Sequence, residues 1–215
     1  MFYQKVIKRI LDFIAALIGL IILAPFFPLI ALLIIIDSPG PVLYLQKRMG
    51  YRGKEFTIYK FRTMVKDATS KGAGFYFEAN DPRVTKVGAF LRKTSLDELP
   101  QLINILRGDM SIVGPRPQLV FIVKKYFDYY EPVLAVRPGL TGLAQISGRT
   151  ALRRSQMVAL DQEYAQKISF LKDLSIILKT VRVVLLRAGV KTDVSEDFME
   201  DLVPINGANN FPLCP

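Results

Sequence analysis

The chain has 215 residues, of which 51% are hydrophobic, and its 29 Lys and Arg against 19 Asp and Glu give a formal net charge of +10. It has no histidine and one cysteine, Cys214, which excludes an internal disulfide, a Cys/His metal cluster and histidine acid–base catalysis. The mean hydropathy of +0.27 indicates contact with lipid, and the charge favours nucleic acid, acidic lipid headgroups or phosphorylated substrates, although a solvated basic surface explains the charge equally well.

The N-terminal part of the chain predicts a membrane segment. Residues 13–36 carry no charge, and a spanning helix needs about 20 apolar residues. Pro25 cannot donate a backbone hydrogen bond to Ile21, so we predict a break at Ala24-Pro25. Basic residues flank both ends of the run, which places both ends on the cytoplasmic side. We therefore favour a re-entrant helix–break–helix and keep a true span as the alternative.

A small β-hairpin is predicted next, from residues 42–48 and 54–64 with a glycine-containing turn between them. Alternation along the second strand places Lys60 and Arg62 on one face. On this pattern alone, an exposed basic edge that discourages aggregation is the favoured role for the two cations. The polar residues 66–84, which contain glycines, predict a mobile loop.

Two acidic residues, Asp97 and Glu98, follow the predicted helix 87–95 and precede a second helix that a glycine ends. The sequence from Ser95 to Glu98 fits a capping box, in which the acids only start a helix. Pro100 disfavours that alternative, because its missing N–H would remove a bond inside the helix. A helix that begins nearer the acids leaves both carboxylates at its mouth, pointing about 100° apart, so we expect them to have different tasks.

Arginine is prominent in two later segments. Arg116 lies between Pro115 and Pro117, which predicts an extended backbone in a stiff loop. Residues 137–149 hold three glycines with an arginine at each end, and they predict a second loop whose backbone N–H groups approach phosphate. The segment matches neither common glycine-rich nucleotide motif.

Two further helices are predicted, over residues 119–130 and 170–190. The second repeats apolar residues on one face and basic residues on the others, and this pattern fits a membrane-interface helix and a core-facing helix equally well. The tail 191–215 is acidic and has few core-forming residues, so we expect it to be loosely held.

Several long motifs, in order, resemble the monotopic phosphoglycosyl transferases, the bacterial sugar transferases that begin glycan assembly. The resemblance runs through residues 8–64, which end in KFRTM, through DPRVTKVGAFLRKTSLDELPQLINILRGDMSIVGPRP and through RPGLTGLAQISGR. It covers most of residues 7–150 and extends weakly to 180. Larger members carry an extra multi-pass region, so the chain is expected to be a minimal catalytic form.

The family resemblance implies a mostly helical α+β fold in three parts: a re-entrant membrane helix (1–40), a cytosolic catalytic domain with a short hairpin and interfacial helices (41–190), and the acidic tail (191–215). It implies transfer of a phospho-sugar from a UDP-sugar to a polyprenyl phosphate such as undecaprenyl phosphate, with release of UMP, as the first membrane step of glycoconjugate assembly such as exopolysaccharide synthesis. The expected partners are these substrates and membrane lipid, without nucleic acid. The expected location is the cytoplasmic face of the bacterial inner membrane.

By the same resemblance, Asp97 is the nucleophile of a ping-pong reaction through a covalent phospho-sugar intermediate, and it is a ligand of the required Mg²⁺. Glu98 is its catalytic partner. Arg92 is expected to bind phosphate, and Arg116 is expected to bind the nucleotide.

Lys60 and Arg62 are further candidate phosphate contacts. Family members often have serine before the proline of the membrane helix, whereas this chain has Ala24, so the way in which the break is satisfied is open.

The proposed chemistry explains an acidic pair in a basic chain. A carboxylate that attacks a diphosphate is repelled by roughly 4 kcal/mol per charge pair at about 4 Å, so cations have to surround it. A carboxylate also needs no histidine to activate it at neutral pH. The alternative is a non-catalytic membrane-anchored binder of anionic lipid or nucleic acid. The sugar and the oligomeric state, including a homodimer, stay open.

Overall fold

The structure is a computed structural model, and it describes residues 2–68, 81–148, 151–186 and 201–202. It is mostly helical with two small β-sheets, which confirms the predicted α+β class. The helices are α1 (Lys8–Leu23), α2 (Phe27–Asp37), α3 (Lys86–Thr94), α4 (Gln101–Arg107), α5 (Val120–Lys125), α6 (Phe127–Leu134), α7 (Leu143–Ser147), α8 (Arg154–Gln166) and α9 (Phe170–Leu186). The strands are β1 (Leu43–Met49), β2 (Glu55–Phe61), β3 (Ser111–Val113) and β4 (Gly139–Thr141).

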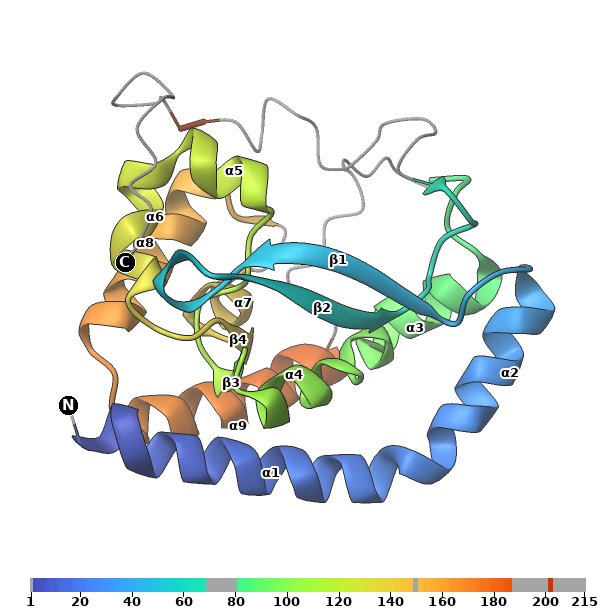
Figure 1. The fold of residues 1–215 in the computed structure, drawn as a ribbon, viewed down its shortest axis with the longest axis horizontal. Coiled ribbons are helices and arrows are strands. Elements are labelled where there is room, and N and C mark those ends of the chain that lie inside the picture. The colour runs from blue at the N-terminus through green and yellow to red at the C-terminus, as the bar shows by residue number, and fades with distance from the viewer. Residues whose placement is uncertain (1, 69–80, 149–150, 187–200, 203–215) are drawn as a thin grey trace.

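The N-terminal helix is broken where the sequence predicts a break. A 3₁₀ turn at Ala24–Phe26 separates α1 from α2, which turns away from it (Figure 1). No single described helix is long and apolar enough to cross a membrane, but Tyr3–Leu23 and Phe26–Asp37 meet that test as a pair bent by 64°. Such a bent pair fits a re-entrant hairpin as well as a broken span.

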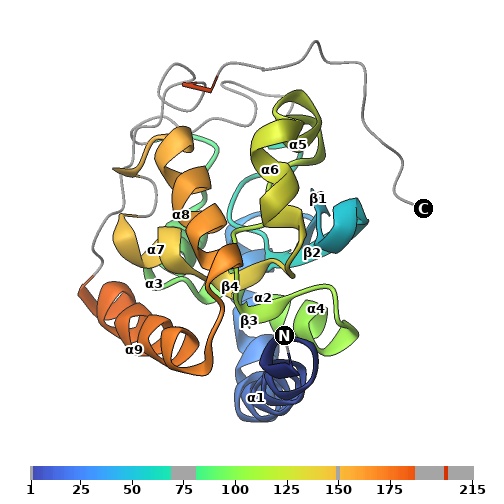
Figure 2. The same cartoon turned by 90° about the vertical axis from the view of Figure 1, so that its left-hand side faces the viewer.

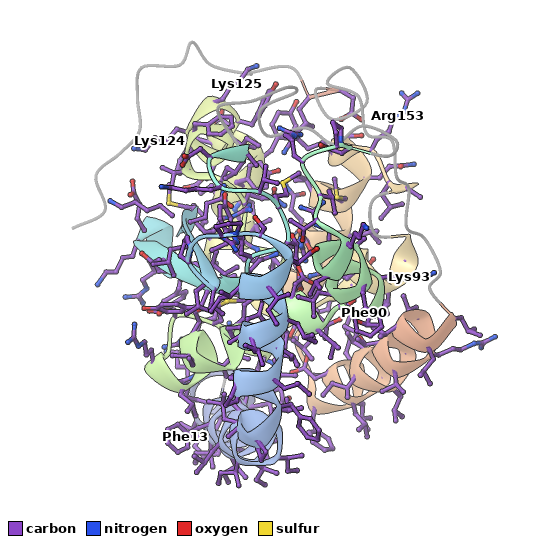
Figure 3. The ribbon with its side chains drawn as sticks, turned by 90° about the vertical axis from the view of Figure 1, so that its right-hand side faces the viewer. Phe13, Phe90, Lys93, Lys124, Lys125 and Arg153 are labelled. Atoms are coloured by element: carbon purple, nitrogen blue, oxygen red, sulfur yellow. The ribbon has the colours of Figure 1, made fainter. Side chains whose placement is uncertain are left out.

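Helix α1 buries polar residues and exposes apolar ones, which is the reverse of the usual pattern in a soluble domain. Its buried residues are Lys8, Asp12 and Ala16, while large apolar side chains such as Phe13 and Ile21 are exposed. An apolar surface that extends along a whole helix marks a lipid or protein contact. Figure 3 shows Phe13 at this edge of the molecule, and it shows Lys124, Lys125 and Arg153 at the opposite end. The exposed apolar residues of α1 therefore lie at one edge of the molecule, and these three cations lie at the opposite end.

The buried polar residues of α1 connect it to the rest of the protein. Lys8 Nζ donates to Asp173 Oδ2 of α9 over 2.8 Å, and Tyr164 Oη donates to Asp173 Oδ1 over 2.6 Å. Asp12 accepts bonds from Ser111 Oγ (2.7 Å) and from the backbone N–H of Ile112 (2.9 Å) in β3. These bonds hold α1, α9 and β3 together, and α1 and α9 both lie along the lower edge in two views (Figure 1, Figure 2).

The predicted hairpin is present. Strands β1 and β2 are antiparallel in a register that runs from Leu43 opposite Phe61 to Met49 opposite Glu55. The second strand ends at Phe61, three residues before its predicted end. Ile58 is buried in a core cluster with Ala16 of α1 and Ile105 of α4, so the hairpin lies against α1 and against the helix that follows the acidic pair.

The loop predicted over 137–149 is wrong, because most of it is regular structure. Residues 139–141 form β4, parallel to β3, and α7 follows directly. The glycines allow close backbone packing: a Cβ on Gly139 would lie 2.1 Å from Gly114 N, and a Cβ on Gly142 would lie 2.1 Å from Gly114 O. The N–H of Gly139 bonds to Pro115 O, so the pairing uses an N–H that the prediction assigned to phosphate.

The later helices are confirmed with changes. The segment 119–130 is helical but divided at Tyr126, whose φ of −122° and ψ of 38° are not helical. Helix α8 was not predicted. In α9 the apolar residues Leu171, Leu178 and Leu185 are exposed, whereas Ile176 is buried. The core-facing alternative is therefore wrong for the apolar face of α9.

Two other predicted segments contain buried residues. Asp81 and Arg83, both buried, form an ion pair of 2.7 Å at the end of the predicted loop 66–84, whose residues 69–80 lie outside the described part. In the tail, Asp201 accepts a bond from the N–H of Ser155, and Leu202 is buried in a core cluster. The rest of the tail lies outside the described residues.

Candidate active site

The acidic pair lies in a turn between α3 and α4. Ser95 has a left-handed backbone (φ 59°) that ends α3, and a 3₁₀ turn at Leu96–Glu98 follows. Pro100 precedes the first residue of α4, so its missing N–H removes no bond inside that helix. The Ser95 side chain does not cap this turn. The capping-box alternative is therefore wrong, and the acids lie ahead of the helix, as Pro100 indicated.

Glu98 is held by two cations from distant parts of the chain. Its Oε1 accepts hydrogen bonds of 2.8 Å from Lys60 Nζ of β2 and from Arg116 Nη2 of the loop after β3. Burial alone would raise the pKa of Glu98, but Arg116 and Lys60 outweigh burial and hold the pKa well below its usual range. Glu98 is therefore a permanent anion that orders two cations around the turn.

Asp97 has the opposite character. Burial first, and the charge of Glu98 second, raise the pKa of Asp97 to about 6, against the opposing effect of Lys60, Arg92 and Arg116. Among the described residues, none donates a hydrogen bond to its carboxylate, whereas Glu98 accepts two. Adjacent carboxylates with pKa values pushed apart are typical of groups with different roles. With a pKa of about 6, the Asp97 carboxylate is mostly ionised at neutral pH and is available to a ligand or substrate, whereas Glu98 is already bonded.

Arg92 approaches the pair from α3. Its Nε donates to Thr63 Oγ1 over 2.8 Å. Burial lowers the pKa of Arg92, and the charge of Asp97 opposes this effect, so the two groups act on each other. The structure thus gathers Lys60, Arg92 and Arg116 near Asp97.

Arg62 lies apart from this group. It is 6% exposed and donates to the carbonyls of Pro39 (3.0 Å) and Ser38, at the end of α2. A cation is favourable beside the free carbonyls of a helix C-terminus. The contact between Arg62 and phosphate stays a prediction. The exposed-edge alternative is wrong, because the side chains of both Arg62 and Lys60 are largely buried.

Two residues that the sequence analysis missed lie beside the pair. Arg48 and Gln101 line a cavity together with Lys60 and Arg116. The hairpin register was the available signal: Arg48 is opposite Phe56, and Phe56 shares a strand face with Lys60.

Asp161 of α8 was also missed. It is 1% exposed, and burial raises its pKa to about 8 against the charge of Arg116 and a hydrogen bond from the Arg116 backbone. Asp161 therefore helps to hold the backbone of the Arg116 loop in place. No helix was predicted at its position, so nothing in the sequence analysis pointed to it.

The described carboxylates fit a magnesium site only if substrate phosphates supply some of the ligands. No group of three or more Asp, Glu or Cys side chains that could hold a metal ion occurs among residues 2–68, 81–148 and the shorter described segments. Mg²⁺, however, is commonly bound by one or two carboxylates, with water and substrate phosphates completing the shell. Asp97 supplies such a carboxylate, while Lys60 and Arg116 already occupy Oε1 of Glu98.

Comparison with known proteins identifies the family. The bacterial sugar transferase family matches residues 3–187. The chain is 42% identical over 200 residues to the exopolysaccharide production protein ExoY of Rhizobium meliloti, covering 85% of this chain and 87% of that protein. It is 39% identical over 200 residues to undecaprenyl-phosphate galactose phosphotransferase of Salmonella typhimurium (86% and 42% covered). It is 40% identical over 186 residues to undecaprenyl-phosphate glucose phosphotransferase of Komagataeibacter xylinus (81% and 35% covered). The chain therefore belongs to the bacterial sugar transferases.

Proposed function

We propose that the protein transfers a phospho-sugar from a UDP-sugar to a polyprenyl phosphate and releases UMP. The names of the two phosphotransferase relatives support the reaction class. The observation that carries the assignment of residues is the unequal acidic pair. Lys60 and Arg116 bind Glu98, while Asp97 is half-buried near the same cations and accepts no hydrogen bond from them.

In this proposal the reaction has two steps at one phosphorus atom. An Asp97 carboxylate oxygen attacks the β-phosphorus of the UDP-sugar, an acyl phosphate bond forms, and the bond to the α-phosphate oxygen breaks, so that UMP leaves with the electron pair. A phosphate oxygen of the polyprenyl phosphate then attacks the same phosphorus and releases the Asp97 carboxylate. No proton has to be removed from either nucleophile at neutral pH, which suits a chain without histidine.

The surrounding cations have the task of accepting negative charge. Lys60 and Arg116 are fixed by Glu98, so no rearrangement is needed when a diphosphate arrives. Arg92 is fixed by Thr63. Asp97 would also hold Mg²⁺, which, when bound, neutralises charge on the diphosphate and the leaving phosphate.

The same proposal places the protein at the cytoplasmic membrane face. The exposed apolar residues of α1, α2 and α9 would enter the lipid, and the opposite end, where Lys124, Lys125 and Arg153 lie, would face the cytosol (Figure 3). We favour the re-entrant form of the bent pair α1–α2. This form requires residues 1 and 215 on the same side, so labelling of either terminus from outside would contradict it.

The test is product analysis with a panel of UDP-sugars, polyprenyl phosphate and Mg²⁺. We expect one donor to give UMP with the wild type and none with Asp97→Asn. Release of UDP would indicate glycosyl transfer and overturn the proposal. The non-catalytic binder would bind lipid equally well with Asp97→Asn and release no nucleotide from any donor.

The covalent intermediate has its own test. With the donor alone, and no polyprenyl phosphate, the two-step route predicts up to one UMP per protein and a protein heavier by one phospho-sugar. Wild type and Asp97→Asn are compared by intact-mass analysis. Absence of both products with an active donor would favour direct transfer in one step.

A further inference from the structure

A cavity beside Lys60 and Arg116 plays no part in the reaction steps above. Its lining residues are Arg48, Ile58, Lys60, Gln101, Arg116 and Pro117. Two of these, Lys60 and Arg116, also bind Glu98. The cavity is thus continuous with the cations of the acidic pair, but its own polar groups come from β1 and from the first residue of α4.

The cavity has hydrogen-bond donors that nothing in the described structure satisfies. Gln101 is 2% exposed, and its Nε2 has no partner. Arg48 Nε is also buried without a partner, although Arg48 Nη1 donates to Pro117 O (3.1 Å) and Nη2 to Gln46 Oε1 (2.6 Å). Buried donors are almost always paired, since an unpaired one is costly. Two unpaired donors on residues that line one cavity require acceptor oxygens, which water or a bound ligand supplies.

The charges at the cavity point to the same kind of ligand. Three cationic side chains meet there, and Glu98 is the only carboxylate bonded to any of them among the described residues. Burial first, and the charge of Arg116 second, lower the pKa of Arg48 to about 10, although Tyr44 and Glu98 oppose them. The same two causes lower the pKa of Lys60, while Glu98 opposes them. A second anion would relieve this repulsion.

We propose that this cavity binds a phosphoryl group, with Gln101 Nε2 and Arg48 Nε as donors to its oxygens. The inference deepens the proposed function, because the group would belong to one of its substrates, either the nucleotide or the polyprenyl phosphate. Gln101 and Arg48 are then substrate-binding residues. Arg116 and Lys60 would join the new site to the Asp97–Glu98 turn.

The test measures binding to the full-length protein in nanodiscs. The probes are inorganic pyrophosphate, UMP, uridine and a short polyprenyl phosphate. Gln101→Met keeps the shape of the side chain but removes the donor, and Arg48→Lys keeps the charge but removes Nε. The matched control is Gln162→Met, because the Gln162 side chain bonds to Tyr129 O outside the cavity.

We expect Gln101→Met and Arg48→Lys to weaken binding of pyrophosphate about tenfold, as for one lost bond to a charged group. Uridine should bind equally well to all variants, and Gln162→Met should bind as the wild type does. Weakening of UMP identifies the nucleotide as the source, and weakening of the polyprenyl phosphate identifies the lipid. Unchanged affinity of every phosphoryl probe, in variants whose unfolding midpoint is that of the wild type, would overturn the inference.

The outcome can be separated from that of the proposed reaction. Asp97-dependent UMP release with unaltered phosphoryl binding in Gln101→Met and Arg48→Lys contradicts the cavity alone. Cavity-dependent binding of pyrophosphate without UMP release from any donor contradicts the reaction alone. If either variant unfolds early, the other still tests the inference, because Gln101 and Arg48 lie on different elements, α4 and β1.

Discussion

Asp97→Asn should inactivate the protein and also stabilise it. The difference between a pKa of about 6 and the ordinary value of 3.8 corresponds to about 3 kcal/mol, at 1.36 kcal/mol per pKa unit. Because the pKa is raised in the folded state, the stability contributed by the protonated group is present below about pH 3.8 and is lost as the pH rises through about 6. At neutral pH the ionised carboxylate therefore opposes folding.

Asparagine keeps the shape of the Asp97 side chain but cannot ionise. We expect Asp97→Asn to raise the free energy of unfolding by less than about 1 kcal/mol at pH 4 and by about 3 kcal/mol at pH 8. Denaturant titrations of both proteins in the same detergent measure the difference at each pH. The other groups titrate in both proteins, so their contributions cancel in the comparison.

Glu131→Gln is the control, because Glu131 is an exposed carboxylate on α6. Its effect should stay within about 0.5 kcal/mol at both pH values. Equal stability of Asp97→Asn and wild type at pH 8, or a gain that does not depend on pH, would refute the reasoning that Asp97 is ionised at an energetic cost.

Three further predictions concern other parts of the molecule. Glu98→Gln should lower the pKa of Asp97, because the repelling charge of Glu98 is lost. In a plot of the remaining kcat against pH, the fall in kcat on the acidic side should therefore occur at a lower pH than in the wild type. A fall that stays near pH 6 would contradict this prediction. Gly139→Ala should reduce the free energy of unfolding by about 1–3 kcal/mol, since its Cβ would lie 2.1 Å from a backbone nitrogen; an unchanged value would show that the β3–β4 pair can shift. The last prediction uses a cysteine-free variant of the protein in nanodiscs, with a fluorophore attached at Leu178→Cys or at Lys179→Cys. A quencher in the lipid phase should quench the fluorophore at position 178 and not the one at 179, because neighbours on a helix point about 100° apart. Equal quenching at both positions would contradict an interfacial α9.

Local signals in the sequence predicted much of the fold. A proline that removes an N–H located the break in the membrane helix, and alternation located the hairpin. Pro100 decided between two positions for the acidic pair. These features depend on neighbours in the chain, so their physics can be read without tertiary structure.

Long-range pairing could not be predicted in the same way. Glu98 meets Lys60 across 38 residues and Arg116 across 18, and no pattern within one segment reports such a contact. The glycines of 137–149 suggested a phosphate loop, but their use is decided by Gly114, which directly follows β3. Arg62 looked equivalent to Lys60 by alternation, although the strand ends between them and Arg62 meets the end of α2.

The polar side of α1 means that the membrane anchor cannot be exchanged as a module. Ala16 is fully buried against α4 and β2 residues, and Asp12 completes the bonding of β3, the strand that leads to Arg116. A chimera that carries an unrelated hydrophobic helix would keep the protein in the bilayer and remove the carboxylate that accepts bonds from Ser111 Oγ and from the N–H of Ile112. Mutations in the anchor and in the enzyme are therefore expected to be coupled, and a water-soluble version requires a redesigned outer face of α1 and not its deletion.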